Sequence, residues 1–150
     1  MPPDRDYSVI IDYAHSPDGL ENILRTLNEI KRGRLITVFG CGGDRDKAKR
    51  PIMGRIASEL SDISIITSDN PRSEEPEQIV NQIVVGTKGS KNTIFVEVDR
   101  IKAIEMALKK AKEGDIVLLA GKGHETYQIL NTGKIHFDER EIVNNILGRK

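Results

Sequence analysis

The feature that most constrains the fold of this chain is a regular alternation between short apolar runs and stretches of helical periodicity. Five runs rich in apolar residues are typical of buried strands, and they span residues 9–11, 35–39, 63–67, 93–98 and 116–120. Between the first two runs, apolar residues recur at helical spacing, at Leu20, Ile23, Leu24 and Leu27. Helical stretches also follow the later runs, so the sequence predicts a mostly parallel sheet covered by helices on both faces.

Residues with clear preferences for helix ends mark several boundaries. Ser16-Pro17 predicts the start of the first helix, and Pro76 that of the third. Asp99 can cap the fourth helix, which Gly114 would end. Apolar faces are expected from Ile52, Ile56 and Leu60 on the second helix and from Ile101, Ile104 and Leu108 on the fourth.

The end of the chain departs from this alternation. Residues 127–130 and 134–137 flank Asn131-Thr132-Gly133, a pattern typical of a hairpin, which we expect to add an antiparallel edge strand. Asp138, with Glu141 three residues later, predicts a last helix that starts with a capping box. The predicted fold class is α/β, a Rossmann-like three-layer sandwich with a mostly parallel sheet of about six strands. We expect residues 1–150 to form one domain, with residues 1–7 as a linker.

Composition excludes several classes of function. Lys and Arg together number 23, as do Asp and Glu, so the net charge is zero, which argues against non-specific binding to nucleic acid or to an anionic membrane. No apolar run approaches the roughly 20 residues of a membrane-spanning helix, and no apolar signal segment begins the chain. Cys41 is the only cysteine, so no internal disulfide can form, and we expect a cytoplasmic protein.

Four loops that follow predicted strands carry unusual residues. They are Asp12-Tyr13-Ala14-His15, the glycine loop at residues 40–46, Asp69-Asn70-Pro71-Arg72, and residues 121–125. In an open α/β sheet, ligands bind at the carboxyl ends of the strands. Because the fold would bring all four loops to one edge, the sequence predicts a binding site there.

The glycine loop matches a dinucleotide-binding fingerprint only in part. Arg45 stands where that fingerprint needs its third glycine, which argues against a nicotinamide cofactor. Glycines in a tight turn are the alternative interpretation. The basic residues that follow, Arg45, Lys47, Lys49 and Arg50, suit either a solvated helix start or the binding of a carboxylate or phosphate.

The loop Gly121-Lys122-Gly123-His124-Glu125 is not a P-loop. Ile116 stands where the first glycine would be, and Gly123 follows the lysine where Ser or Thr should bind the metal. The loop could let a ligand approach the backbone, with Glu125 accepting hydrogen bonds from an amine. An ordinary glycine turn is the alternative.

The remaining polar candidates are ambiguous when each is taken alone. Asn70 and Arg72 together suit the zwitterionic end of an amino acid, although an Asx turn followed by a surface arginine explains them as well. His15 and His124 are expected to form hydrogen bonds, because no Cys/His spacing supports a zinc site. Cys41 has no special features of a nucleophile.

Taken in order, the four loops resemble the C-terminal domain of the Mur ligases. Residues 12–17 (D-Y-A-H-S-P) resemble the D-Y-A-H-x-P segment of the family, and residues 40–47 and 121–125 resemble two further segments. Asp69-Asn70-Pro71-Arg72 resembles the signature of the family branch that adds meso-diaminopimelate. The resemblance covers the chain from about Val9 to the final helix.

This resemblance implies an ATP-dependent ligation in peptidoglycan biosynthesis, in the cytoplasm. The γ-carboxyl group of UDP-N-acetylmuramoyl-L-alanyl-D-glutamate would be activated as an acyl phosphate and attacked by the amine of meso-diaminopimelate. ATP and magnesium belong to the complete enzyme, whose N-terminal and central ATPase domains are absent from this chain. We therefore expect no tightly bound cofactor and no ligase activity from this domain alone.

The resemblance also implies roles for particular residues. The expected contacts to meso-diaminopimelate are Arg45, Asp69, Asn70, Arg72, Gly121 and Glu125. Asp12 and His15 are expected to face the nucleotide, and neither metal ligands nor catalytic residues are expected in this chain. The alternatives are a domain of a related ligase that adds lysine or acts on folate, and a stand-alone Rossmann-like binding module. Asn70 with Arg72 argues against the lysine and folate readings.

Overall fold

The computed structural model describes residues 7–43, 47–121, 127–130 and 133–148. Within them, a single parallel sheet of five strands forms the centre of the molecule, in the order β1-β5-β2-β3-β4. The strands are β1 (Ser8–Asp12), β2 (Leu35–Phe39), β3 (Ile63–Ile66), β4 (Thr93–Val96) and β5 (Ile116–Ala120). Each apolar run predicted as a strand therefore forms one, and every pairing within this sheet is parallel.

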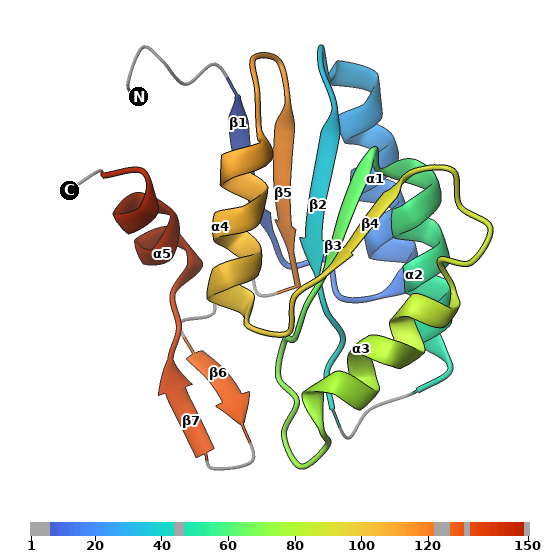
Figure 1. Ribbon diagram of the computed structural model, residues 1–150, viewed down its shortest axis with the longest axis vertical. Coiled ribbons are helices and arrows are strands. Elements are labelled where there is room, and N and C mark those ends of the chain that lie inside the picture. Colours follow the sequence, from blue (N-terminus) through green and yellow to red (C-terminus); the bar gives the residue numbers. More distant parts are fainter. Residues whose placement is uncertain (1–6, 44–46, 122–126, 131–132, 149–150) are drawn as a thin grey trace.

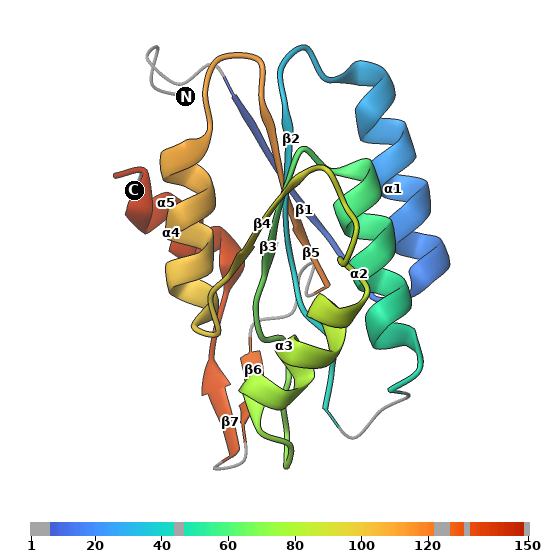
Figure 2. The ribbon, with the colours of Figure 1, turned by 45° about the vertical axis from the view of Figure 1, so that its right-hand side comes forward.

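Helices cover both faces of the sheet, which gives three layers. The helices are α1 (Pro17–Ile30), α2 (Lys49–Leu60), α3 (Pro76–Val85), α4 (Arg100–Lys110) and α5 (Glu139–Ile146). Figures 1 and 2 show α1, α2 and α3 on one face and α4 and α5 on the other. The predicted α/β three-layer class is confirmed.

The core is divided between these two faces. One buried cluster joins α1, α2 and α3 to the sheet and includes Leu24, Phe39 and Ile83. The other joins α4 and α5 to the opposite face and includes Ile104 and Val143. Because β2 and β5 are buried at every position, their side chains contribute to both clusters, which explains why these strands read as continuous apolar runs.

The predicted helix starts are confirmed in detail. The Oγ of Ser16 accepts a hydrogen bond of 3.1 Å from the amide of Gly19, with Pro17 in the first turn. Asp99 caps α4 by accepting from two amides, and Asp138 caps α5 by accepting from the amide of Arg140. These caps satisfy backbone donors that have no partner within the helix.

The end of the chain differs from expectation in its pairing. Strands β6 (Tyr127–Leu130) and β7 (Gly133–His136) form the predicted hairpin, but they pair with each other in a separate two-stranded sheet. The main sheet thus has five strands and gains no edge strand from the hairpin. Glu141 does not complete a capping box among the described contacts, because its carboxylate pairs with His136 across 2.6 Å.

The expected apolar faces of two helices are confirmed except at the first residue of each. Ile56 and Leu60 on α2 pack against one core cluster, and Ile104 and Leu108 on α4 are buried in the other. Ile52, however, is 43% exposed and Ile101 is 42% exposed. The buried face of α2 also contains Met53, Gly54 and Ala57. A Cβ atom on Gly54 would lie 2.1 Å from the carbonyl oxygen of Ile83, so α2 and α3 approach too closely for a large side chain between them.

The order of the strands positions the functional loops. The chain runs outward from β1 to β4, and α4 then returns it so that β5 lies between β1 and β2. The four strands that precede the unusual loops are therefore neighbours, in the order β1, β5, β2, β3. Because all of them are parallel, their carboxyl ends meet at one edge. No helix in the described part of the chain is long and apolar enough to cross a membrane.

Candidate functional site

A pocket of about 310 Å³ lies at the carboxyl edge of the sheet. All four loops singled out in the sequence contribute to its wall. The residues that line it are Tyr13, His15, Gly40, Cys41, Gly42, Lys49, Asp69, Asn70, Arg72 and Gly121. The structure thus brings together the described members of the predicted site, apart from Asp12, whose loop contributes Tyr13 and His15.

The loop after β1 is held by its own polar groups. The Oδ2 of Asp12 accepts a hydrogen bond of 2.9 Å from the amide of Ala14. The Nδ1 atom of His15 lies 2.9 Å from the carbonyl oxygen of Tyr13, and the rings of these two residues lie 4.6 Å apart. This arrangement presents one aromatic ring and one imidazole at the mouth of the pocket.

The glycines of the second loop are required by close backbone packing. A Cβ atom on Gly40 would lie 2.3 Å from the carbonyl oxygen of Thr67, and one on Gly43 would lie 1.8 Å from that of Pro71. Both distances are far below any non-bonded contact, so only glycine lets this loop lie against the loop after β3. The amide of Gly43 also donates to the carbonyl of Asn70 across 2.7 Å.

Arg50 ties these two loops to the helix layer. Its guanidinium group donates to both carboxylate oxygens of Glu74, to Gln82 and to the carbonyl of Gly42. The side chain of Arg50 is completely buried. Of the two readings considered for the basic cluster, Arg50 fits neither a solvated residue nor a ligand-binding one, because the protein itself supplies its carboxylate.

The loop after β3 contains a strained residue. Arg72 has a φ of 53°, and no other described residue except glycine has a positive φ. Its Nη1 atom donates to the carbonyls of Gly43, at 3.0 Å, and Asn70, at 3.3 Å. These bonds hold the guanidinium group of Arg72 over the pocket, and its Nε and Nη2 atoms make no hydrogen bond to any described residue. Left-handed backbone at a residue with a Cβ is costly and is often found at functional sites.

The loop after β5 is described only at its start. Gly121 has a φ of 118°, which favours glycine, and its amide donates to the carbonyl of Asp12 across 3.0 Å. A Cβ atom there would lie 3.6 Å from Oδ2 of Asp69, so three loops meet at this point. The predicted contacts Arg45 and Glu125, together with His124, lie outside the described residues.

Cys41 lines the pocket, but its thiol is expected to be unreactive. Burial raises the pKa of its thiol to about 12, and its Sγ lies 3.7 Å from Sδ of Met53. The thiol is therefore protonated at neutral pH and a poor nucleophile. In the part of the chain that the structure describes, no group of three or more His, Cys, Asp or Glu residues could hold a metal ion.

Five residues that line the pocket were not assigned to the site from the sequence, namely Tyr13, Gly40, Cys41, Gly42 and Lys49. Of these, Tyr13 and Lys49 bring large polar side chains to the pocket wall. Lys49 begins α2 and its Nζ donates to the carbonyl of His15 across 3.2 Å, which brings a positive charge to the pocket wall. Tyr13 is 48% exposed. The sequence motifs contained both residues, since Tyr13 belongs to the first loop and Lys49 to the basic cluster. The orientation of their side chains toward the pocket, however, depends on the tertiary structure.

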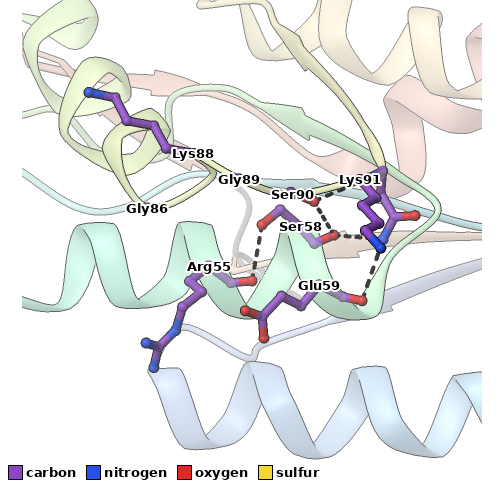
Figure 3. A pocket seen from close by; sticks show the side chains of 9 residues that line it. Arg55, Ser58, Glu59, Gly86, Lys88, Gly89, Ser90 and Lys91 are labelled. Atoms are coloured by element: carbon purple, nitrogen blue, oxygen red, sulfur yellow. Dashed lines mark hydrogen bonds between the residues drawn. The ribbon is translucent and has the colours of Figure 1, made fainter.

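A second pocket at the opposite end of α2 is structural. Figure 3 shows Ser90 directed at the end of this helix, where Ser90 Oγ and Asn92 Nδ2 both donate to the carbonyl of Ser58. These bonds satisfy a carbonyl at the helix end. The basic side chains around it, among them Arg55 and Lys88, are exposed, so the charges at this pocket are solvated.

The fold and the first pocket together define an α/β domain with a pocket at the carboxyl ends of parallel strands, the place where open α/β sheets bind ligands. Residues 2–123 match the family model described as Mur ligase, glutamate ligase domain. The chain therefore belongs to the Mur ligase family, as its four loops had suggested.

Individual relatives are similar over nearly the whole chain. It is 61% identical, over 144 residues, to the UDP-N-acetylmuramoyl-L-alanyl-D-glutamate–2,6-diaminopimelate ligase of Clostridium perfringens. The aligned residues make up 96% of this chain and 29% of the relative. The ligase of the same name from Clostridioides difficile is 52% identical, over 99% of this chain and 31% of its own length. The chain thus spans less than a third of these relatives.

Solved structures agree with the assignment to the family. A structure of a diaminopimelate ligase of the same name superposes with a TM-score of 0.92 and 42% identity, over 97% of this chain and 30% of the other. The E. coli protein FolC, in complex with ADP, superposes with a TM-score of 0.56 and 23% identity, over 75% of this chain and 25% of the other. The second likeness concerns the fold alone.

Proposed function

We propose that this chain is the amino-acid-binding domain of an ATP-dependent ligase that adds meso-diaminopimelate to UDP-N-acetylmuramoyl-L-alanyl-D-glutamate. The observation that carries the proposal is the position of Arg72, which lines the pocket and whose guanidinium group bonds to the described residues through Nη1 only. The high identity to two ligases of this name supports it.

The chemistry of the amino acid explains why an arginine is needed. Meso-diaminopimelate is in effect lysine with an additional carboxylate beside its distal amine. A guanidinium group can donate two parallel hydrogen bonds to a carboxylate, and the Nε–Nη2 edge of Arg72, which makes no bond to the residues that the structure describes, is suited to donate them. We assign Arg45 as a second donor, and Asn70, Asp69 and Glu125 to the neighbouring ammonium group. Gly121 would let the ligand approach the backbone.

In the proposed reaction, ATP phosphorylates the γ-carboxyl group of the precursor. The amine of meso-diaminopimelate then attacks the acyl phosphate, an amide bond forms, and phosphate and a proton leave. The residues described here orient the amine, which accelerates the reaction by proximity. We assign Asp12 and His15 to the side that faces the nucleotide.

The rest of the machinery is assigned elsewhere. Magnesium, the P-loop and the site for the UDP end of the precursor would belong to the N-terminal and central domains of the complete enzyme. We propose that the complete enzyme works in the cytoplasm, without a nucleic-acid or membrane partner. The chain alone would bind meso-diaminopimelate weakly, because the acyl-phosphate side of the pocket would be missing. It would not turn over ATP, because the phosphate cradle and the magnesium ligands are assigned to the other domains.

The proposal is tested by substituting Arg72 in the complete ligase that contains this chain. Losing one partner of a buried charged pair costs roughly 2–5 kcal/mol. At about 1.4 kcal/mol per tenfold, Arg72→Ala should lower kcat/KM for meso-diaminopimelate by about 30-fold to several thousand-fold. Arg72→Lys should recover only part of it, because an ammonium group lacks the planar fork. Phosphate release with each amino acid measures the effect.

A matched control is Arg55→Ala, which removes an exposed arginine near the opposite end of α2 and should leave kcat/KM unchanged. Any residual activity with lysine should change little in the Arg72→Ala variant, because lysine lacks the distal carboxylate. If the wild-type enzyme prefers lysine, or if Arg72→Ala keeps its selectivity for meso-diaminopimelate, the proposed substrate is wrong.

A further inference from the structure

Arg100, which is not a pocket-lining residue of the proposed site, connects two of its loops from behind. It is the first residue of α4 and is 1% exposed. Its Nη1 donates to the carbonyl of Ser68 at 3.1 Å, and its Nη2 donates to the carbonyl of Ala120 at 3.0 Å. Each of these carbonyls belongs to the residue directly before a predicted ligand contact, Asp69 in one loop and Gly121 in the other.

The third nitrogen of Arg100 is anchored in the last helix. Its Nε donates to Oε2 of Glu139 across 2.7 Å, and both side chains are completely buried. Glu139 is the first residue of α5. A buried carboxylate thus neutralises the guanidinium group and fixes its orientation, which leaves the two Nη atoms to set the separation of the ends of β3 and β5.

Other contacts converge on the same segment. The Oγ of Ser68 donates across 2.7 Å to the carbonyl of Val98, two residues before α4 begins. Gln128 of the hairpin donates through Nε2 to the carbonyl of Asp69 across 2.6 Å. The backbone directly before Asn70 is therefore held from α4, α5 and β6, elements that supply none of the described pocket-lining residues.

We propose that Arg100, oriented by Glu139, is a positioning residue that sets the spacing between the Asp69–Arg72 loop and Gly121 and thereby the affinity for the amino-acid substrate. The proposal rests on the proposed function, in which these two loops bind the amino acid. A displacement of about 1 Å in a site can cost on the order of a hundredfold in rate. The effect should be specific to the amino acid, because ATP is assigned to other residues.

The experiment uses the complete ligase with Arg100→Lys and with the double substitution Arg100→Met, Glu139→Leu. Replacing both members of a buried ion pair by apolar residues often preserves folding, so the double variant removes both tethers without leaving an unpaired charge. In each variant, KM for the amino acid should rise roughly tenfold or more, with a much smaller change in KM for ATP. Arg100→Lys should be the less affected, because its ammonium group can still reach one partner.

Arg34→Lys is the matched control. Like Arg100, Arg34 pairs with a buried carboxylate and donates to a carbonyl: its Nη2 bonds to Asp115 and to the carbonyl of Lys110, at the other end of the sheet. The Arg34→Lys substitution should lower the melting temperature and leave the KM values for the amino acid and for ATP unchanged. Equal changes of both KM values in the Arg100 variants, or no change in a folded double variant, would overturn the proposal.

The substrate assignment is checked separately by the wild-type enzyme, assayed with meso-diaminopimelate and with lysine. If it uses lysine, the proposed substrate fails, and the role of Arg100 is then judged on KM for lysine. Hydrogen exchange of the amides of residues 67–70 and of Arg72 in the wild type and in the double variant gives a readout that is independent of activity. Faster exchange there in the double variant supports the tethering, and unchanged exchange contradicts it.

Discussion

The amide nitrogen of Gly43 lies 2.7 Å from the carbonyl oxygen of Asn70, so two loops of the proposed site are joined directly, backbone to backbone. This contact accounts for the glycines of the residue 40–43 loop by the packing of the two loops, so no bound nucleotide is needed to explain them. These glycines admit a neighbouring loop, and the arginine that lines the pocket, Arg72, reaches back to the carbonyl of Gly43. The two loops therefore form one unit.

Substituting Gly43 should test this unit. The Cβ atom of alanine would lie 1.8 Å from the carbonyl oxygen of Pro71, so the loops must separate. Overpacking of this kind costs typically about 1–3 kcal/mol, and we expect Gly43→Ala in the complete enzyme to raise KM for the amino acid as well. Urea unfolding and steady-state kinetics measure the two effects.

The matched control for Gly43 is Gly89, whose added Cβ would meet nothing within 4 Å but whose φ is 86°. Gly89→Ala should cost about 1–2 kcal/mol through the left-handed backbone alone and should leave KM unchanged. A Gly43→Ala enzyme with normal KM would show that the loops need not touch for binding.

Arg72 should separate stability from function. Its φ of 53° penalises any residue with a Cβ atom. Compared with Arg72→Ala, the Arg72→Gly variant should be about 0.5–1 kcal/mol more stable, after allowing for the greater freedom of glycine in the unfolded chain. Both variants should have a much lower kcat/KM for the amino acid, because both lack the guanidinium group. Equal stabilities in urea unfolding would contradict the assigned backbone strain.

Cys41 should be unreactive in the folded protein. With a pKa raised to about 12 by burial, about one thiol in ten thousand is ionised at pH 8, and the thiolate is the reactive form. A maleimide or disulfide reagent should therefore label the native protein very slowly and the urea-unfolded protein quickly. Rapid stoichiometric labelling without loss of structure would mean that the thiol is accessible and ionised.

Asp115 should make stability depend on acid pH. Burial raises the pKa of its carboxyl, but hydrogen bonds from the amides of Arg34 and Lys112 and from the guanidinium group of Arg34 outweigh it, so the pKa is lowered. A carboxyl whose pKa is lower in the folded state stabilises the fold at pH values above the unfolded pKa of about 4. This contribution is lost as the pH falls through the folded pKa.

The matching variant is Asp115→Asn, which keeps the shape of the side chain and removes the charge. It should be roughly 1–3 kcal/mol less stable at pH 7, because the buried donors around Asp115 lose a charged acceptor. Its stability should also fall less steeply than that of the wild type below pH 4. Parallel pH curves from chemical denaturation would rule out this contribution of Asp115.

Local patterns in the sequence determined much of the fold. The five strands appear where apolar runs predicted them, and the caps at Ser16, Asp99 and Asp138 were predictable because a cap and its helix are neighbours in the chain. The full extent of the buried face of α2 was not predictable in this way. Its burial depends on how closely α3 approaches at Gly54, and that distance is a property of two helices together.

The loops that form the pocket could also be recognised from the sequence, through their glycines and charged residues and through their resemblance to a family. Their arrangement could not, because it depends on the insertion of β5 between β1 and β2. Tertiary structure likewise decided the roles of Arg50 and Arg100. In sequence each is one more cation at the start of a helix, and only folding brings a carboxylate and the carbonyls of the loops to it. Burial removes water as a competing partner, so a charge must find its partners within the protein, and those partners lie far away in the chain.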